Sequence, residues 1–172
     1  MYNLTQPLHT ASNCTPGMIA TACEDRTVTW GELRDRTARL AGALRALGIN
    51  EGDNVAILAL NSDRYLEFSF GAFWAGAVIV PMNTRWSATE NAYSLNDSGT
   101  SVLFIDAAFL PMVEDIKAET NQELTFVYLD DGDVPAGMQA YEEFLQAGEP
   151  VEDVRRGGSD LAGIYYLSLI HI

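Results

Sequence analysis

The stretch GAFWAGAVIVPMN, residues 71–83, decides how the rest of this chain is interpreted. Small and aromatic residues lead into Gly76, four apolar residues follow, and Pro81 ends the run. Glycine suits the end of a helix because it tolerates a positive φ, and proline cannot donate a hydrogen bond within a sheet. The run 77–80 is too short for a helix and is rich in β-branched residues. The stretch therefore predicts a helix that packs directly onto a buried strand.

Three further apolar runs are expected to form buried strands: VAILAL at 55–60, VLFI at 102–105 and a run at 124–129. A continuous apolar run is typical of a strand that is covered on both faces, as in a parallel sheet. The four runs are spaced evenly, with room between them for one helix and two short loops. The predicted fold class is therefore α/β, with a mostly parallel sheet and flanking helices.

Two capping boxes, Thr29-x-x-Glu32 and Ser87-x-x-Glu90, mark the starts of two helices. In this motif the hydroxyl and the carboxylate each accept a hydrogen bond from a helix N–H group that otherwise has no partner. The resulting expectations are a short helix at 18–25, an edge strand at 26–28, helices at 29–48, 63–74, 87–99 and 106–119, a weaker helix at 141–147, and a last strand beginning at 161–166.

The composition argues against several classes of function. Lys and Arg total 10 and Asp and Glu total 24, which gives a formal net charge of −14. An acidic surface repels phosphate backbones, so we expect no nucleic-acid partner. No segment approaches the roughly 18–20 apolar residues that a membrane helix needs. The polar N-terminus has no basic region of a signal peptide, and Cys14 and Cys23 are too few for a zinc site, so we expect a cytoplasmic protein.

The residues alone do not reveal a reaction. Neither G-x-G-x-x-G nor G-x-x-x-x-G-K-[ST] occurs, and the basic segment 155–159 precedes a strand instead of joining a strand to a helix. Side chains that we expect to be solvent-exposed are the helix residues Arg34, Arg36, Arg39 and Arg45, the acidic pairs Asp130-Asp131 and Glu142-Glu143, and the histidines His9 and His171. We assign no catalytic, cofactor-binding or metal-binding residue.

Four motifs follow one another over residues 27–105. They are the helix start Thr29-Trp30-Gly31-Glu32-Leu33, the turn Gly48-Ile49-x-x-Gly52-Asp53-x-Val55-Ala56, the stretch Ala75-Gly76-Ala77-Val78-x-Val80-Pro81-Met82-Asn83, and the turn Asp97-Ser98-Gly99. Their order and spacing resemble the N-terminal part of the adenylate-forming (AMP-binding) superfamily. Within that superfamily the chain is most similar to acyl-CoA synthetases, which include the fatty acid–CoA ligases.

The resemblance implies an enzyme that uses ATP, Mg²⁺ and coenzyme A. Such enzymes convert a carboxylic acid and ATP to an acyl-adenylate, release pyrophosphate, and pass the acyl group to a thiol, commonly that of CoA. The partners implied are thus a small carboxylic acid and CoA. In the family a Lys-containing Ser/Thr/Gly-rich loop, later acidic residues and a lysine on a C-terminal domain carry this chemistry. None of these can be placed on this sequence, so we expect the chain by itself to be inactive.

The resemblance also divides the chain into three parts. We expect residues 1–12 to be a flexible lead-in and residues 13–166 to be a partial AMP-dependent synthetase/ligase N-terminal domain. Residues 160–166 are similar to the strand before the Ser/Thr/Gly-rich loop, but the apolar hexapeptide LSLIHI follows them. Because this hexapeptide is apolar and has no glycine, its backbone N–H groups cannot surround a phosphate. We therefore expect residues 167–172 to be a non-native tail. The alternative is a stand-alone α/β module that binds a small molecule or regulates a partner.

Overall fold

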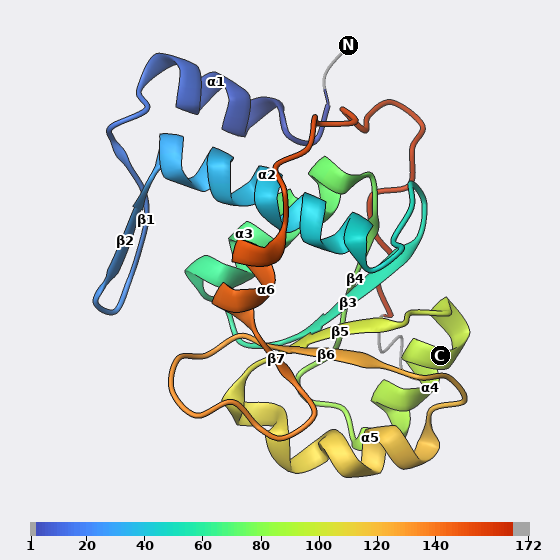
Figure 1. The fold of residues 1–172 in the computed structure, drawn as a ribbon. Helices are drawn as coiled ribbons and strands as arrows, with labels where there is room; N and C mark the ends of the chain where they lie inside the picture. The colour runs from blue at the N-terminus through green and yellow to red at the C-terminus, as the bar shows by residue number, and fades with distance from the viewer. Residues whose placement is uncertain (1–2, 167–172) are drawn as a thin grey trace.

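The computed structural model describes residues 3–166, and the tail expected at 167–172 lies outside the described residues. Figure 1 shows the fold. The elements in chain order are α1 (Gln6–Cys14), β1 (Ile19–Cys23), β2 (Arg26–Thr29), α2 (Trp30–Ala46), β3 (Asn54–Leu58), α3 (Asp63–Ala75), β4 (Val78–Pro81), α4 (Ala88–Ser98), β5 (Val102–Ile105), a 3₁₀ helix (Ala107–Met112), α5 (Val113–Glu119), β6 (Thr125–Tyr128), β7 (Gln139–Ala140) and α6 (Tyr141–Ala147).

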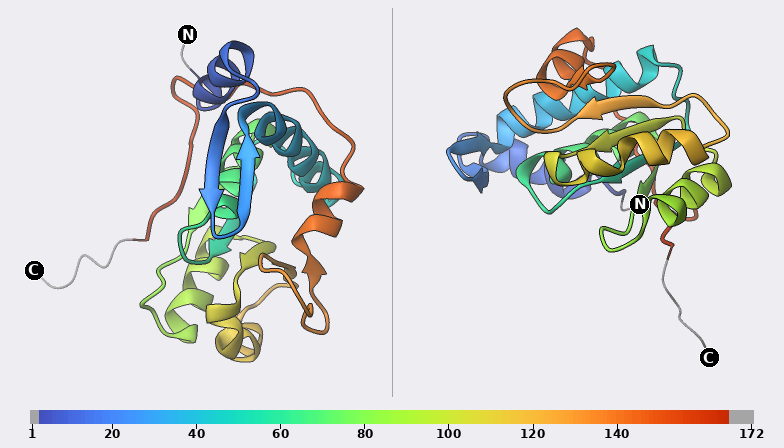
Figure 2. Two further views of the ribbon diagram at one scale, coloured as in Figure 1. Left: turned by 90° about the vertical axis from the view of Figure 1, so that its left-hand side faces the viewer. Right: turned by 90° about the horizontal axis from the view of Figure 1, so that it is seen from below.

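The central sheet confirms the predicted α/β class. Its five strands lie in the order β4–β3–β5–β6–β7, and each neighbouring pair runs parallel. Helices α2, α3 and α6 lie on one side of this sheet and α4 and α5 on the other (Figure 1). The two short strands β1 and β2 form a separate antiparallel hairpin that contacts α2 and α3 (Figure 2).

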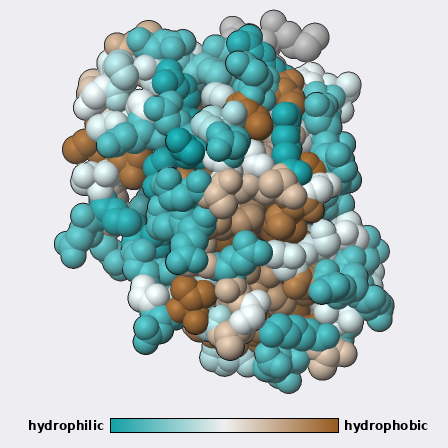
Figure 3. Space-filling view, viewed as in Figure 1, coloured by the Kyte–Doolittle hydropathy of each residue, from teal (hydrophilic) through white to brown (hydrophobic). Residues whose placement is uncertain are grey.

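Burial on both faces explains the continuous apolar run of β3. Val55 and Ile57 belong to the hydrophobic core shared with α2 and α3, whereas Ala56 and Leu58 belong to the core shared with α4 and α5. Successive side chains of a strand point to opposite faces, so both sets of positions have to be apolar. The outer surface differs from this interior. The face seen in Figure 3 is mostly hydrophilic, with apolar patches between the polar residues.

The opening stretch 71–83 folds as predicted. Gly76 ends α3 in the left-handed conformation, with a φ of 86°, and β4 begins two residues later. Both capping boxes are also present. Glu32 accepts from the Thr29 N–H at 2.8 Å, and Glu90 accepts from the Ser87 N–H at 2.9 Å. Among residues 3–166, no helix has both the length and the apolar character of a membrane span.

Three local predictions are wrong. The segment predicted as a helix at 18–25 is instead strand β1 with a tight turn into β2, in which Glu24 has a φ of 51°. Residues 6–12 of the expected flexible lead-in belong to α1, because Leu8 is fully buried in the core and Pro7 suits the first helical turn. His9 is not a free terminal side chain, since its ring stacks on Trp74 and Nε2 lies 2.6 Å from the Asp153 carboxylate.

The last strand, predicted to begin at 161–166, is reduced to one bridge. After α6 the chain crosses α2 without regular structure and returns to the outer edge of β4 (Figure 2). There Ile79 pairs with Gly163 in a parallel bridge, in which the Ile79 N–H donates to Ala162 at 3.1 Å and the Ile164 N–H donates to Ile79 at 2.9 Å. The segment therefore runs in the same direction as β4, toward the carboxyl ends of the strands.

Candidate functional site

The strand order of the central sheet reverses at β3. The chain passes from β3 to β4 on one side and then returns to place β5 on the other side of β3. In open parallel sheets such a reversal leaves a crevice outside the carboxyl ends of the strands, and ligands commonly bind there. A cavity of about 410 Å³ lies at this place and is lined by residues that follow β3, β5 and β6, together with residues of the β1–β2 hairpin and of α3. We call it the carboxyl-edge cavity.

Asp106 joins the two strands that flank the reversal. It follows β5, is almost fully buried, and accepts hydrogen bonds from the N–H of Leu60 at 2.7 Å and of Ala108 at 3.0 Å. Burial raises the pKa of the Asp106 carboxyl, although these backbone hydrogen bonds act in the opposite direction. Asp130 makes a similar contact, since it accepts from the Ala107 N–H at 2.6 Å. Both carboxylates therefore fix the backbone of this edge.

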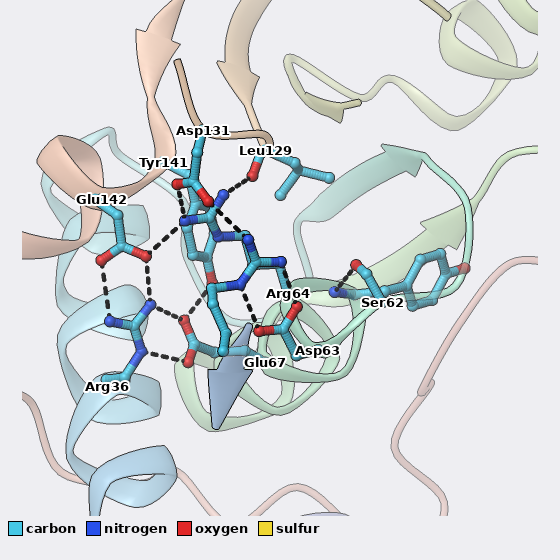
Figure 4. Close-up of polar contacts among 11 residues, drawn as sticks. Arg36, Ser62, Asp63, Arg64, Glu67, Leu129, Asp131, Tyr141 and Glu142 are labelled. Carbon is cyan, nitrogen blue, oxygen red and sulfur yellow. Dashed lines mark hydrogen bonds and ion pairs between the residues drawn. The ribbon is translucent and has the colours of Figure 1, made fainter. Parts of the chain in front are cut away.

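Arg26, Arg64 and Asp131 line one side of the cavity and belong to a larger group of charged side chains, most of which Figure 4 labels. Three arginines and four acidic residues pair with one another, and a tyrosine hydroxyl joins them. The members of this arginine–acid cluster are Arg26 of β2, Arg36 of α2, Asp63, Arg64 and Glu67 of α3, Asp131 of the loop after β6, and Tyr141 and Glu142 of α6. The cluster thus connects elements that are far apart in the sequence.

Arg64 lies at the centre of the cluster and is only 4% exposed. Its guanidinium donates to the Leu129 carbonyl, to Asp131 Oδ1 at 2.7 Å and to Glu142 Oε1 at 3.1 Å. It also lies 5.3 Å from the centre of the Tyr141 ring, within the range of a cation–π contact. A buried charge is tolerated when opposite charges and hydrogen bonds accompany it. Both terminal nitrogens of Arg64 have such partners, whereas its Nε has no hydrogen-bond partner among the described residues.

Arg36 and Glu67 form the most buried ion pair of the cluster. Two parallel hydrogen bonds join them, Nε to Oε2 at 2.6 Å and Nη2 to Oε1 at 2.9 Å. The Tyr141 hydroxyl also donates to Glu67, at 2.6 Å. Burial raises the pKa of Tyr141 well above its usual value, and the Glu67 charge adds to this effect. The tyrosine therefore stays protonated and serves as a donor.

The sequence analysis missed this cluster. Arg36 was expected on a solvated helix face, but its guanidinium is bound by Glu67 and Glu142. Asp131 is exposed as expected, yet its carboxylate bridges Arg26 and Arg64. Arg26 and Arg64 were not singled out at all. One available signal was the spacing of Arg64 and Glu67, because residues three apart lie on the same face of a helix.

Acid is expected to weaken the folded state through this cluster. Hydrogen bonds from Arg64 lower the pKa of Asp131. Burial acts to raise the pKa of Glu142, but the hydrogen bonds and charges of Arg36 and Arg64 together lower it. Such carboxylates stabilise the fold at any pH above their unfolded pKa, about 4, and lose this contribution as the pH falls through the folded pKa. We expect the urea midpoint of unfolding to be nearly constant from about pH 7 to pH 5 and to fall below about pH 4.

Two variants separate this effect from general acid unfolding. Asp131→Ala removes one of the shifted carboxylates, so its urea midpoint should decline less steeply with acid than that of the wild type. Asp133→Ala removes an exposed acid from the same loop and should leave the slope unchanged. Equal slopes for all three proteins would show that Asp131 does not contribute to the acid sensitivity.

Most charged side chains of the carboxyl-edge cavity already have partners within the protein. Within residues 3–166, no group of three His, Cys, Asp or Glu side chains is placed to hold a metal ion. The cavity acids Asp106 and Asp130 are engaged by backbone N–H groups, and Arg26 and Arg64 are engaged by carboxylates. We therefore assign none of these residues to the cofactors.

Comparison with known proteins shows the family. Residues 8–168 match the family described as AMP-binding enzyme. The chain is 41% identical over 143 residues to the long-chain-fatty-acid–CoA ligase of Thermus thermophilus, an alignment that covers 83% of this chain and 26% of that protein. It is 43% identical over 103 residues to the fatty acid–[acyl-carrier-protein] ligase ScoC of Streptomyces coeruleorubidus, an alignment that covers 60% of this chain and 20% of that protein.

Solved structures agree with these matches. The fatty acyl CoA synthetase of Mycobacterium tuberculosis superposes with a TM-score of 0.81 at 30% identity, over 96% of this chain and 32% of that chain. The anthranilate CoA ligase AuaEII, solved with anthranoyl-AMP, superposes with a TM-score of 0.86 over 94% of this chain and 31% of that chain. Because its sequence identity is 24%, this match supports the fold alone. The resemblance inferred from the four motifs is confirmed, and the chain spans about a fifth to a quarter of the length of these two curated relatives. This chain belongs to the AMP-binding enzyme family.

Proposed function

We propose that this chain is part of an ATP-dependent carboxylate–CoA ligase. In the proposed reaction a carboxylic acid and ATP give an acyl-adenylate and pyrophosphate, and the thiol of CoA then takes the acyl group. The observation that supports this most is the 41% identity to the long-chain-fatty-acid–CoA ligase of Thermus thermophilus, which extends over 83% of the chain. ATP and Mg²⁺ would supply the activated phosphate and the cation that neutralises pyrophosphate.

We assign to this chain a scaffolding share of that reaction. The parallel sheet directs three loops toward the carboxyl-edge cavity, and Asp106 and the arginine–acid cluster hold those loops in place. The segment that pairs with Ile79 runs toward the same edge of the sheet. Residues that touch the phosphates and the acid are proposed to lie elsewhere in the longer protein, so the 172 residues are inactive on their own.

The relatives do not agree on which carboxylic acid is activated or on which thiol accepts the acyl group. One relative is named for long-chain fatty acids and another, from Arabidopsis thaliana, for benzoate. ScoC is named for an acyl-carrier-protein instead of CoA. We propose a cytoplasmic location, which suits the free thiols of Cys14 and Cys23.

The proposed function is tested on a longer protein. Its gene is the genomic reading frame that contains codons 1–166 and continues beyond them. The extended protein is expected to exchange pyrophosphate into ATP when a long-chain fatty acid or benzoate is added, and to consume CoA thiol with the same acid. The 172-residue chain should give only background exchange in the same assay. A folded extended protein that is inactive with every acid tested would contradict the proposed function, and exchange by the 172-residue chain would contradict its inactivity.

The same sequencing tests the proposal that residues 167–172 are non-native. The family match ends at residue 168, so it includes two of these six residues. We expect intact genomic DNA to continue after codon 166 with a Ser/Thr/Gly-rich segment in place of LSLIHI. A genuine stop codon directly after Ile172 would overturn this proposal.

A further inference from the structure

The first three residues of the loop after β6 hydrogen-bond to other elements, and Met138 at the other end of the loop packs against the core shared with α4 and α5. The loop runs from Leu129 to residue 138, has no regular secondary structure, and its acidic tip, residues 130–133, is exposed. Within residues 3–166, its hydrogen bonds to other elements come from Leu129, Asp130 and Asp131. The Leu129 and Asp130 bonds hold the start of the loop to the end of β5 and to Arg64. Asp131 is the last of these attachments, and residues 132 and 133 complete the tip beyond it.

Asp131 contacts two arginines from different elements. Its Oδ1 accepts from Arg64 of α3 at 2.7 Å and its Oδ2 accepts from Arg26 of β2 at 2.7 Å. Figure 4 shows the carboxylate directed at the Arg64 guanidinium. All three residues line the carboxyl-edge cavity. The contacts therefore bring the loop, the hairpin and α3 together along one wall of that cavity.

We propose that Asp131 is a latch, which holds the loop after β6 against Arg26 and Arg64 and so closes one wall of the carboxyl-edge cavity. Releasing the carboxylate frees the tip of the loop and widens the cavity. This is a conformational device at the reversal point of the sheet, and it does not depend on the proposed ligase activity.

The arginines are positioned independently of the latch. Without Asp131, Arg26 would still donate two hydrogen bonds to Asp63, at 2.9 and 2.8 Å. Arg64 would still donate to the Glu142 carboxylate and to the Leu129 carbonyl. Both guanidinium groups should therefore stay in place when Asp131 is removed. The Asp131 side chain is 63% exposed, so its loss leaves no buried group behind on the loop. The change is then confined to the loop, as a latch requires.

Cys23 provides a probe of the cavity wall that the chain already contains. It lies at the end of β1, where it pairs with Arg26, is half-buried, and lines the carboxyl-edge cavity. Cys14 is exposed and lies at the end of α1, away from the cavity. An opening of the wall should raise the reactivity of Cys23 toward a thiol reagent without changing that of Cys14, because access limits the reaction of a half-buried thiol.

The test compares Asp131→Ala with Asp133→Ala, which removes an exposed acid from the same loop. In Asp131→Ala, amide hydrogen exchange over residues 129–134 is expected to become about three- to tenfold faster, as for the loss of two charge-assisted hydrogen bonds at an exposed site. Maleimide labelling of Cys23 should be faster by a similar factor, and labelling of Cys14 should be unchanged. Asp133→Ala should match the wild type in all three measurements.

Asp131→Glu serves as the rescue variant, because a longer carboxylate still reaches the arginines and should restore most of the protection. Far-UV circular dichroism checks that each variant keeps its secondary structure. Exchange and Cys23 labelling equal to the wild type in Asp131→Ala would overturn the proposal. Equal increases in Asp131→Ala and Asp133→Ala would overturn it as well, because they would show an effect of loop charge without any latch.

Discussion

Gly42→Ala is expected to destabilise the protein by about 3 kcal/mol or more, or to prevent folding. Gly42 lies in α2 where the chain after α6 crosses the helix. A Cβ atom on Gly42 would lie 1.9 Å from the carbonyl oxygen of Glu149 and 2.9 Å from its carbonyl carbon. Backbone atoms cannot move aside as a side chain could. In an open helix the same change would stabilise by about 1 kcal/mol, so the sign of the effect depends on this crossing.

The segment after α6 contacts α2 at several backbone positions, so it cannot easily shift to make room for a Cβ atom on Gly42. A Cβ atom on Gly148 would lie 2.1 Å from the Arg39 carbonyl oxygen, and the Val151 N–H donates to Ala38 at 3.3 Å. Shifting the crossing segment would break these contacts. The measurement is urea unfolding followed by circular dichroism, with Gly17→Ala as control because a Cβ there meets nothing within 4 Å. A Gly42→Ala protein as stable as the wild type would show that the crossing can move at no cost.

The sequence predicted those parts of the fold that local chemistry determines. The capping boxes at Thr29 and Ser87, the glycine at 76 and the buried runs of β3 to β6 all appear where they were expected. Each of them depends on neighbours within a few residues, or on a burial pattern that one strand carries by itself. Local signals of this kind are visible in a single sequence.

The parts that were predicted wrongly depend on distant contacts. The segment MIATACED after Pro16-Gly17 predicts a short helix, but pairing with β2 outweighs that weak local preference. Helix α1 is ordered because Leu8 reaches the core beside α2, and no periodicity in residues 1–12 indicates this. The crossing at Gly42 is likewise invisible, since Glu149 is more than a hundred positions away in the sequence.

The arginines of α2 show the same limit for the candidate site. Arg34 and Arg36 are two positions apart and both were expected to be solvated. Arg34 pairs with the adjacent Asp35, and its side chain is 39% exposed. Arg36 points toward α3 and binds Glu67, which is buried. Positions two apart on a helix face different directions, so the partner on the neighbouring helix decides the role of each arginine.

Arg36→Met is therefore expected to destabilise the protein by about 3–5 kcal/mol, whereas Arg34→Met should cost less than about 1 kcal/mol. Methionine keeps much of the apolar stem of arginine but removes the charge and every donor. In Arg36→Met the Glu67 carboxylate stays buried and keeps the Tyr141 hydroxyl as its donor. An uncompensated buried charge is costly, while the loss of an exposed pair is not.

Urea unfolding at pH 7 measures both variants, and a double variant identifies the cause. In Arg36→Met with Glu67→Gln the buried charge is absent and the glutamine amide oxygen can still accept from the Tyr141 hydroxyl, so more than half of the lost stability should return. If the loss came from packing of the arginine stem, the double variant would be no more stable than Arg36→Met alone. Equal effects of Arg34→Met and Arg36→Met would contradict the assignment of a buried pair, because exposed and buried arginines would then contribute alike.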